Sequence, residues 1–402
     1  MRAMLHESLI EDARGLAGEI TALRRAIHAE PELGLHTPKT MAKVRKALAD
    51  LPLDWREGSS TTGAVATLKG RAGEGRRVLL RGDMDALPMP EETGLDFAST
   101  VPNTMHACGH DAHTAMLVGA ARLLAQRADA LTGEVQFMFQ PGEEGHHGAR
   151  FMLEDGLIDP IPDAAFALHV FPNAPHGVIG GRAGPLLAAA DQFRLTVTGQ
   201  GGHASLPHET MDPVPVACEI VTALQAMVTR KFSVFDPVVL TVAEIISGTT
   251  HNVIPDSAFI QGTMRSLSAV NRERLRENLR LVAAGIAGAH GLTCDVEIVE
   301  GFPVTVCAAE AVDFGERVVR GMFGEETFLR LGDPIMGAED FAYVLEKVPG
   351  AMFFLGVSHE GEDWSQCCGI HSTKMMIDET VMPQGAATLA GLAEAFLAQG
   401  FG

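Results

Sequence analysis

In Arg76-Arg77-Val78-Leu79-Leu80-Arg81-Gly82-Asp83-Met84-Asp85 an apolar run ends abruptly in a polar cluster, and this pattern is the strongest indication of the fold class. The pattern returns where Val135 to Phe139 runs into Gln140-Pro141-Gly142-Glu143-Glu144-Gly145, and where Ala164 to Leu168 runs into His169. Between the first two runs, residues 112–128 are rich in Ala and Leu at helical spacing. Short buried strands separated by helices are typical of a largely parallel sheet. We therefore expect the α/β class, with a mostly parallel sheet.

All three polar clusters follow the strand that precedes them. In open α/β sheets, ligands gather beyond the carboxyl ends of the strands. The clusters are therefore expected to converge on one edge of the sheet, and this edge is the candidate site.

Residues 188–301 have a different pattern, in which apolar and polar residues alternate at Phe193, Leu195 and Val197. A helix is expected over 213–230, strands near 238–246 and 258–265, a helix over 271–290 and a strand near 295–299. This β-α-β-β-α-β order is that of a ferredoxin-like domain. We expect a discontinuous catalytic domain, residues 1–187 and 302–402, with residues 188–301 inserted as a second domain. Edge strands of such sheets pair readily, which favours a homodimer or a dimer-based tetramer.

Composition excludes several classes of protein. The 402 residues are 46% hydrophobic and 20% charged, as in a well-packed globular protein. A net charge of -20, from 51 acidic and 31 basic side chains, argues against nucleic acid or an anionic membrane as partner. No apolar run approaches the roughly 20 residues that span a bilayer, and residues 1–32 lack a secretory signal pattern. Six cysteines do not make a disulfide framework, so we expect reduced thiols in a cytoplasmic protein.

The segment His106-Ala107-Cys108-Gly109-His110-Asp111-Ala112-His113-Thr114 carries three histidines, a cysteine and an acid. Imidazole and thiolate bind borderline metals such as zinc. A position directly before a helix lowers the pKa of a thiol, so Cys108 is expected to ionise readily. The alternative is that these histidines only pack beneath the helix. Asp111 could also be the N-cap of that helix.

Other acids and imidazoles at strand ends extend this candidate metal site. Metal ions lower the pKa of water, and a neighbouring carboxylate can accept its proton, which suits the pair Glu143-Glu144. Spacing leaves open which glutamate binds metal, and such a pair alone is also common in solvated turns. Asp83 or Asp85 could hold a ligating imidazole through its second nitrogen. His169 and His371 add two imidazoles, although His169 alone could be a core histidine.

The inserted segment contributes His203 after a glycine-rich run, Asn252, and Arg265 at a strand end. Arginine binds a substrate carboxylate through two parallel hydrogen bonds. The alternatives are an incidental histidine in a turn and a surface arginine paired with a local acid. Glu339 and Asp340 lie in a loop, and no spacing rule makes them ligands.

Taken in order along the chain, these segments resemble the metallopeptidase family of aminoacylases, bacterial carboxypeptidases and dipeptidases, and within it the hippurate-hydrolase-like amidohydrolases. The resemblance begins at Arg24 to Gly34 and continues through Gly82 to Pro88, His106 to Thr114, Glu143-Glu144, Leu168 to Val170, Gly201 to Ala204, Asn252 to Pro255 and Ala338 to Phe341. Each segment is a weak signal alone, whereas the ordered set is specific.

The resemblance assigns roles that spacing does not. It implies that Glu143 is the general base, that Asp85 supports a ligand, and that two metal ions are bound by Cys108, His110, Glu144, His169 and His371. Asp83 stands where other branches have a ligating histidine, for which Cys108 compensates. It also implies that the inserted domain is a lid and dimerisation domain. There His203, reaching the partner subunit's site, and Asn252 stabilise the oxyanion, and Arg265 binds the substrate carboxylate.

The function that follows is a metal-dependent amidohydrolase that cleaves N-acyl-L-amino acids into a carboxylate and a free amino acid. One alternative is a dipeptidase or carboxypeptidase with the same two-metal site, and a more distant one is a catalytically silent metal- or ligand-binding protein. Zn²⁺ suits the ligands best, and Mn²⁺, Co²⁺ or Ni²⁺ also fit. Thr373 replaces a usual proline, and His146 and His147 replace usual glycines. Neither departure removes a required group.

Overall fold

The computed structural model describes residues 2–402, with side chains from Glu7 onward. The chain forms two compact units. The first comprises the residues up to Leu186 together with Val306–Asp333 and Asp340–Gly402, and the second comprises Leu187–Thr305 and Pro334–Glu339. The inserted segment expected at 188–301 thus corresponds closely to the second unit, to which the short segment Pro334–Glu339 is added. Nothing in the composition of that short segment signals this.

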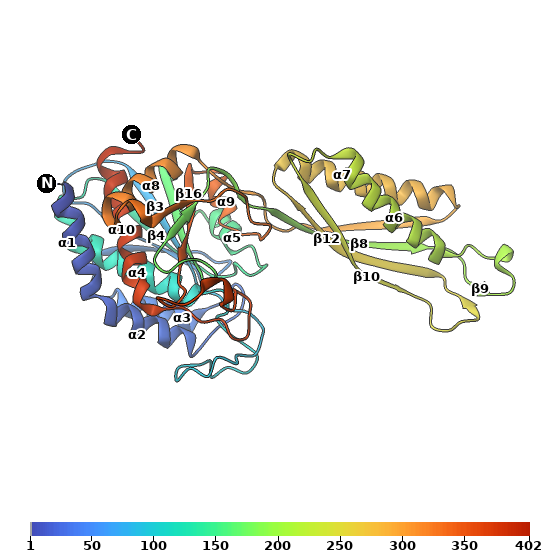
Figure 1. Ribbon diagram of the computed structural model, residues 1–402, viewed down its shortest axis with the longest axis horizontal. Coiled ribbons are helices and arrows are strands. Elements are labelled where there is room, and N and C mark those ends of the chain that lie inside the picture. Colours follow the sequence, from blue (N-terminus) through green and yellow to red (C-terminus); the bar gives the residue numbers. More distant parts are fainter. Residues whose placement is uncertain (1) are drawn as a thin grey trace. The chain divides into compact units, whose positions relative to one another are not determined.

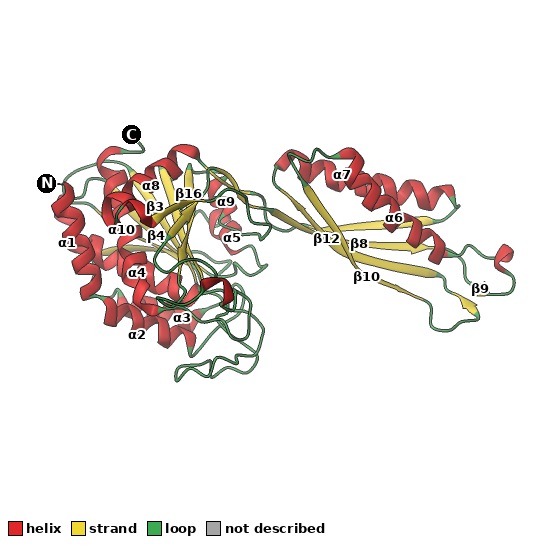
Figure 2. Cartoon of the chain, viewed as in Figure 1, coloured by secondary structure: helices red, strands yellow, loops and turns green. Residues whose placement is uncertain are grey.

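An eight-stranded sheet is the centre of the first unit (Figures 1 and 2). Its order is β1 (Leu53–Glu57), β2 (Ala64–Lys69), β4 (Glu134–Gln140), β3 (Arg77–Asp83), β5 (Ala164–Phe171), β16 (Gly350–Gly356), β6 (Ile179–Gly181) and β15 (Phe328–Arg330). The four central strands β4, β3, β5 and β16 are parallel to their neighbours among these four. The expected mostly parallel α/β sheet is confirmed, and its three central polar-ended strands are adjacent.

Helices pack on this sheet because their apolar faces need cover. The helices of the unit are α1 (Arg2–Gly15), α2 (Ala17–His28), α3 (Pro38–Ala47), α4 (His110–Gln126), α5 (Gly148–Glu154), α8 (Ala309–Phe323), α9 (Ala342–Leu345) and α10 (Met382–Gln399). Helices α4 and α10 both contact β3 and β5. A Cβ at Gly119 of α4 would lie 2.8 Å from Ile20 and 2.9 Å from Ala386, so the small residue permits the close approach of three helices.

The second unit has an antiparallel sheet in the order β10 (Val238–Ser247), β12 (Ser257–Ser266), β8 (Ala189–Thr198) and β13 (Thr293–Val299). Helices α6 (Pro213–Lys231) and α7 (Ala269–Ala289) bury one side against it, and Phe193, Leu195 and Val197 of β8 form part of that core. Along the chain the order is β8-α6-β10-β12-α7-β13, which is the expected ferredoxin-like arrangement. The second unit also contains a short ribbon of β9 (Gly202–His203) and β11 (Val253–Ile254). Another short ribbon, β7 (Gly184–Leu187) with β14 (Thr305–Cys307), lies where the chain passes between the two units.

The helix expected over 112–128 begins earlier, at His110, and ends at Gln126. Its N-cap is Gly109, whose φ of 92° is in the left-handed region that glycine tolerates. Asp111 is therefore not the N-cap, and that alternative is wrong. Among residues 2–402, no helix has the length and apolar character that a membrane span requires.

Candidate metal centre

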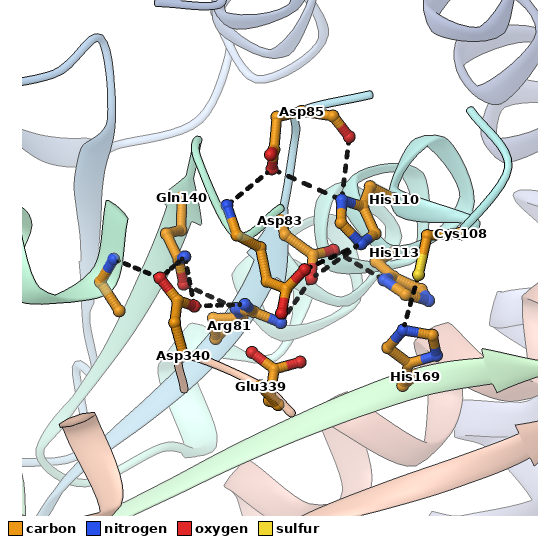
Figure 3. A network of polar contacts seen from close by, with 12 residues as sticks. Arg81, Asp83, Asp85, Cys108, His110, His113, Gln140, His169, Glu339 and Asp340 are labelled. Carbon is orange, nitrogen blue, oxygen red and sulfur yellow. Dashed lines mark hydrogen bonds and ion pairs between the residues drawn. The ribbon is translucent and has the colours of Figure 1, made fainter. Parts of the chain in front are cut away.

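Three adjacent strand ends and the start of one helix bring the ligand-type side chains together (Figure 3). Strand β3 ends at Asp83, β4 is followed by Glu143 and Glu144, and β5 carries His169 near its end. Helix α4 begins with His110 and directly follows Cys108. Because parallel strands end at the same edge, the predicted convergence of the three polar clusters is what the fold produces.

His110 occupies the middle of this cluster with no exposed side-chain surface. Its Nδ1–H donates to the backbone oxygen of Asp85 at 2.9 Å, so Nε2 is the nitrogen that a cation would bind by displacing its proton. Nε2 lies 3.6 Å from Asp83, 3.9 Å from Glu143 and 4.0 Å from Glu144, all measured to carboxylate oxygens. Burial lowers the pKa of His110, but Asp83 and Cys108 outweigh it and raise that pKa well above its usual value. The imidazole is thus held ready for a cation by a fixed hydrogen bond on its other nitrogen.

Cys108 and His169 face each other, with 3.4 Å between Sγ and Nε2. The Nδ1–H of His169 donates to the backbone oxygen of Val170 at 2.7 Å, so its Nε2 is also the free nitrogen. The thiol is buried, and burial raises the pKa of Cys108. The expectation that the thiol of Cys108 ionises readily is therefore wrong, because desolvation outweighs the lowering effect of His110 and His371 on its pKa. A thiolate here requires a bound cation.

The two glutamates are held by the carboxylate of Asp85. Its two oxygens accept the backbone N–H groups of Glu143 and Glu144, each at 3.0 Å. Asp85 Oδ1 also lies 3.5 Å from His110 Nδ1. Asp85 therefore fixes one imidazole and the turn that carries both acids, which is more than the single support that the sequence predicts.

His371 joins the cluster from a distant loop. Its φ of 64° is unusual for a residue with a side chain, and its N–H donates to the backbone oxygen of Ala107 at 2.7 Å. Nε2 lies 3.4 Å from Glu144 Oε1, and half of the side chain, 51%, is exposed. Contacts with Cys108 and Glu144 raise the pKa of His371 to about 10. A bound metal ion would displace that proton.

The chemistry of the donor set fits metal ions. Residues Cys108, His110 and His169 have ligand atoms within 4.8 Å of one another, and so do Cys108, Glu144 and His371. Two buried atoms at this point, His110 Nε2 and Glu144 Oε1, make no hydrogen bond within the described part of the chain. Buried polar atoms are almost always hydrogen-bonded, so two convergent atoms of ligand type that make no hydrogen bond fit a cation between them.

A second ring of buried groups supports these residues. Arg81 donates to Asp83, and to Asp340 at 3.1 Å and Gln140 at 2.8 Å. Asp340 also accepts the backbone N–H of Ala149 at 2.9 Å. Asp340 therefore ties the end of β4 to α5 and is a structural acid. A charged arginine inside the apolar run of β3 was the sequence signal for this network.

Another buried network underlies the start of α4, and sequence reasoning did not identify it. Asp111 accepts from Arg24 and from His28, both at 2.8 Å, and His28 reaches Glu91 at 3.1 Å. Asp111 and Glu91 outweigh burial and raise the pKa of His28 to about 9. Arg24 and His28 lie four residues apart on the buried face of α2, beside Ile20 and Ile27. Two cationic residues on the apolar face of an amphipathic helix were the available signal.

His203 and Asn252 lie next to each other in the second unit. His203 pairs with Val253 across the β9–β11 ribbon, and the backbone oxygen of Asn252 accepts from Ala204 at 3.1 Å. Both side chains are exposed. His203 Nδ1 contacts the Ser205 hydroxyl at 2.8 Å.

Arg265 lies on β12 of the same unit and is half-buried. Its Nη1 donates to the backbone oxygen of Met264 at 3.1 Å, and no carboxylate among residues 2–402 is within ion-pair distance. The nearby acid Asp191 is instead occupied by Arg272 at 2.7 Å and Arg276 at 2.8 Å. The predicted alternative, a surface arginine paired with a local acid, is therefore wrong.

His146, His147, Cys367 and Cys368 lie outside the ligand groups found among residues 2–402. His147 has a φ of 58° at the start of α5, and its Nδ1 lies 2.9 Å from the Tyr343 hydroxyl. The His146 ring lies beside Gly34. Cys367 and Cys368 are free thiols, as expected for neighbours in sequence.

Comparison with known proteins gives the family. The sequence pattern of Peptidase family M20/M25/M40 matches residues 79–395. Thermostable carboxypeptidase 1 of Saccharolobus solfataricus is 39% identical over 98% of this chain and 99% of its own length. The N-acetyl-L-cysteine deacetylase of Bacillus subtilis is 38% identical over 91% of this chain and 85% of its own. The crystal structure of a dinuclear metal binding peptidase from Bacillus subtilis has a TM-score of 0.82, with 32% identity over 96% of this chain and 99% of that one.

The match covers most of the chain in sequence and nearly all of it in structure. It includes both units and every strand end that carries the candidate ligands. The chain therefore belongs to peptidase family M20/M25/M40 and is a metal-dependent amidohydrolase or peptidase.

Proposed function

We propose that this enzyme hydrolyses the amide bond of N-acyl-L-amino acids with a pair of divalent metal ions. The observation that carries the metal centre is the convergence on one point of the sheet edge of two buried atoms that make no hydrogen bond, His110 Nε2 and Glu144 Oε1. The residues proposed to hold the ions are Cys108, His110, Glu144, His169 and His371. When bound, such a pair lowers the pKa of water and polarises the carbonyl of the substrate.

Glu143 is the proposed general base. Its backbone is fixed by Asp85, and its carboxylate is buried 3.9 Å from His110 Nε2. It accepts a proton from the attacking water and delivers it to the amine that leaves, so that the same carboxyl group serves both halves of the reaction. Glu144, the next residue, is held by the other oxygen of Asp85 and contacts His371. Asp85 therefore holds the proposed proton acceptor, Glu143, and the proposed metal ligand, Glu144, in fixed adjacent positions.

The second unit supplies the remaining proposed roles. His203 and Asn252 are proposed to donate hydrogen bonds to the oxyanion, His203 acting in the site of a partner subunit. Arg265 is proposed to bind the carboxylate of the substrate. A half-buried guanidinium without an acidic partner supports this role, because its charge is otherwise uncompensated.

The proposed assembly is a homodimer formed through the second unit. Strands β10 and β13 are the two edges of its sheet, and edge strands are common sites of pairing between subunits. Sedimentation analysis at several concentrations tests this assembly, and a monomer at all of them contradicts it.

The acyl group distinguishes this function from its main rival. One relative is named for deacetylating N-acetyl-L-cysteine, and another, of similar identity, is a carboxypeptidase. We favour the acyl substrate because the motif order resembles the hippurate-hydrolase-like branch. A dipeptidase or carboxypeptidase would use the same metal centre and base.

A substrate panel tests the choice. Purified protein is stripped with a chelator, reloaded separately with Zn²⁺, Mn²⁺, Co²⁺ or Ni²⁺, and assayed on N-acetyl and N-benzoyl amino acids and on matched free-amine dipeptides. We expect the acylated compounds to have the higher kcat/KM with the best metal. A preference for dipeptides would overturn the proposed substrate class, and turnover that is unaffected by the chelator would overturn the metal mechanism.

A further inference from the structure

We propose that His113 is a positioning residue that aligns the imidazole of His169 and the carboxylate of Asp83, and that it binds no metal itself. The inference rests on the proposed metal centre. Judged by distance alone His113 would qualify as a ligand, since its ring lies within 4.8 Å of ligand atoms on Asp83 and His110. Its hydrogen bonds exclude that role.

Both ring nitrogens of His113 are engaged. Nδ1 lies 2.6 Å from Asp83 Oδ1, and Nε2 accepts the backbone N–H of Val170 at 2.8 Å. A peptide N–H can only donate, so Nε2 must carry the lone pair and the proton must be on Nδ1. The backbone of β5 therefore sets the tautomer, and the ring has no lone pair left for a cation.

The backbone of Val170 connects the ring of His113 to the ring of His169. Its N–H is held by His113, and its oxygen accepts from His169 Nδ1 at 2.7 Å. The same residue thus receives one histidine and orients another. His169 Nε2 is consequently directed at Cys108 Sγ, 3.4 Å away. Outer hydrogen bonds of this kind commonly fix the ring orientation of ligating histidines.

The other nitrogen of His113 fixes the carboxylate of Asp83. Oδ1 is taken by His113, while Oδ2 lies 3.6 Å from His110 Nε2 and accepts from Arg81. His113 belongs to α4, Asp83 ends β3, and Val170 lies in β5, so one ring joins the three elements that carry the site. Figure 3 shows His113 beside Asp83. His113 and Asp83 are fully buried, which excludes water as a replacement partner.

Two substitutions separate the two bonds. His113→Asn places an amide near Nδ1, so it can still donate to Asp83 but no longer reaches Val170. His113→Gln places an amide oxygen near Nε2, so it keeps an acceptor for Val170 and loses the donor to Asp83. The matched control is Thr114→Val, the next residue of α4, which removes the hydroxyl bond to the Asp83 backbone oxygen without touching the ligands.

Each apoprotein is titrated with Zn²⁺ in competition with a chromogenic chelator, and the Co²⁺-loaded forms are compared by visible absorption. We expect His113→Asn to weaken zinc binding about 10–100-fold, His113→Gln to weaken it less, and Thr114→Val to bind as the parent does. The cobalt spectrum of His113→Asn should shift because His169 turns, whereas His113→Gln should keep the parental stoichiometry. If His113→Asn fails to fold, the stoichiometry of His113→Gln decides alone.

Parental zinc affinity and cobalt spectrum in His113→Asn would overturn the proposal, because the hydrogen bond between His113 and Val170 would then have no effect on His169. Loss of one bound ion in His113→Gln would also overturn it, because His113 would then be a ligand. Failure of the parent protein to bind zinc or cobalt is a different result and contradicts the metal centre itself.

Discussion

The metal-centre edge of the first unit and the candidate residues of the second unit are built in opposite ways. At the first, His110 and Asp85 are buried, and each is held by hydrogen bonds of its own. In the second, His203 and Asn252 are exposed, and Arg265 has no acidic partner among residues 2–402. The first region is organised before any ligand arrives, whereas the second presents exposed groups and one arginine without an acidic partner.

The two regions differ in what they cost the free energy of folding. Burying the carboxylates of Asp83, Asp85 and Glu143 beside several imidazoles is costly unless each group is paired or a cation is present. The exposed donors of the second unit cost little in the folded chain, and they are proposed to act when substrate arrives. Substitutions of the ligands and their supports at the buried edge should therefore change metal binding or stability. Substitutions of the proposed base Glu143 or of the exposed ribbon should change turnover.

The largest expected effect is on the base. Glu143→Ala should lower kcat about 10²–10⁴-fold, because proton transfer loses its acceptor. Metal content measured by elemental analysis should stay at the parental value, since Glu143 is proposed to bind no metal. Full activity in this variant would show that another group accepts the proton.

The next largest expected effect is on His203, in the exposed ribbon formed by β9 and β11. His203→Ala should reduce kcat about 10²–10³-fold through loss of an oxyanion donor. The melting temperature should not change, because the side chain is exposed and its hydrogen bonds are to Ser205 in the same turn. An unchanged kcat, or a large loss of stability, would remove the contrast between the two regions.

Cys108, a buried thiol, tests the proposed metal-centre edge of the first unit. Cys108→Ser should weaken metal binding about 10-fold or more, at least as much as losing an outer support costs. The apoprotein should remain folded, since serine is similar in size. Equilibrium dialysis measures the change, and unaltered stoichiometry and affinity would exclude Cys108 from the ligands.

The smallest expected effect is on stability and is pH-dependent. Paired with Asp111 and Glu91, His28 has a pKa of about 9 in the folded chain, above its usual value of 6.5. The stabilisation is therefore complete below pH 6.5 and is lost as pH rises through 9. His28→Gln should remove on the order of 1–3 kcal/mol of that pH-dependent stability. Urea unfolding at pH 6 and pH 9.5 measures it. A parent and variant with the same pH slope would contradict the pairing.

Sequence reasoning went furthest where periodicity and strand-end polarity are local properties. The parallel strands ending at Asp83, Gln140 and near His169 were predictable because a buried strand must be apolar until its last residues. The order of elements in residues 188–301 was predictable for the same reason. These patterns also brought the three polar clusters to one edge.

Contacts between distant segments were not predictable. No local rule pairs His28 with Asp111, 83 positions away, or directs His113 to the Val170 peptide. The pKa of Cys108 was misjudged because a helix start is visible in sequence, whereas the depth of burial that raises the pKa is not. The roles of Glu143 and Glu144 came from resemblance, and Asp85 holds both residues in the same way.

The most direct test of the central claim is a metal titration of the stripped protein, followed by hydrolysis of an N-acyl amino acid. We predict that two divalent ions bind per chain, that activity returns as the sites fill, and that Cys108→Ser shifts both curves together. A stripped protein that hydrolyses the substrate at the full rate, or that takes up no divalent ion at the sheet edge, would contradict it.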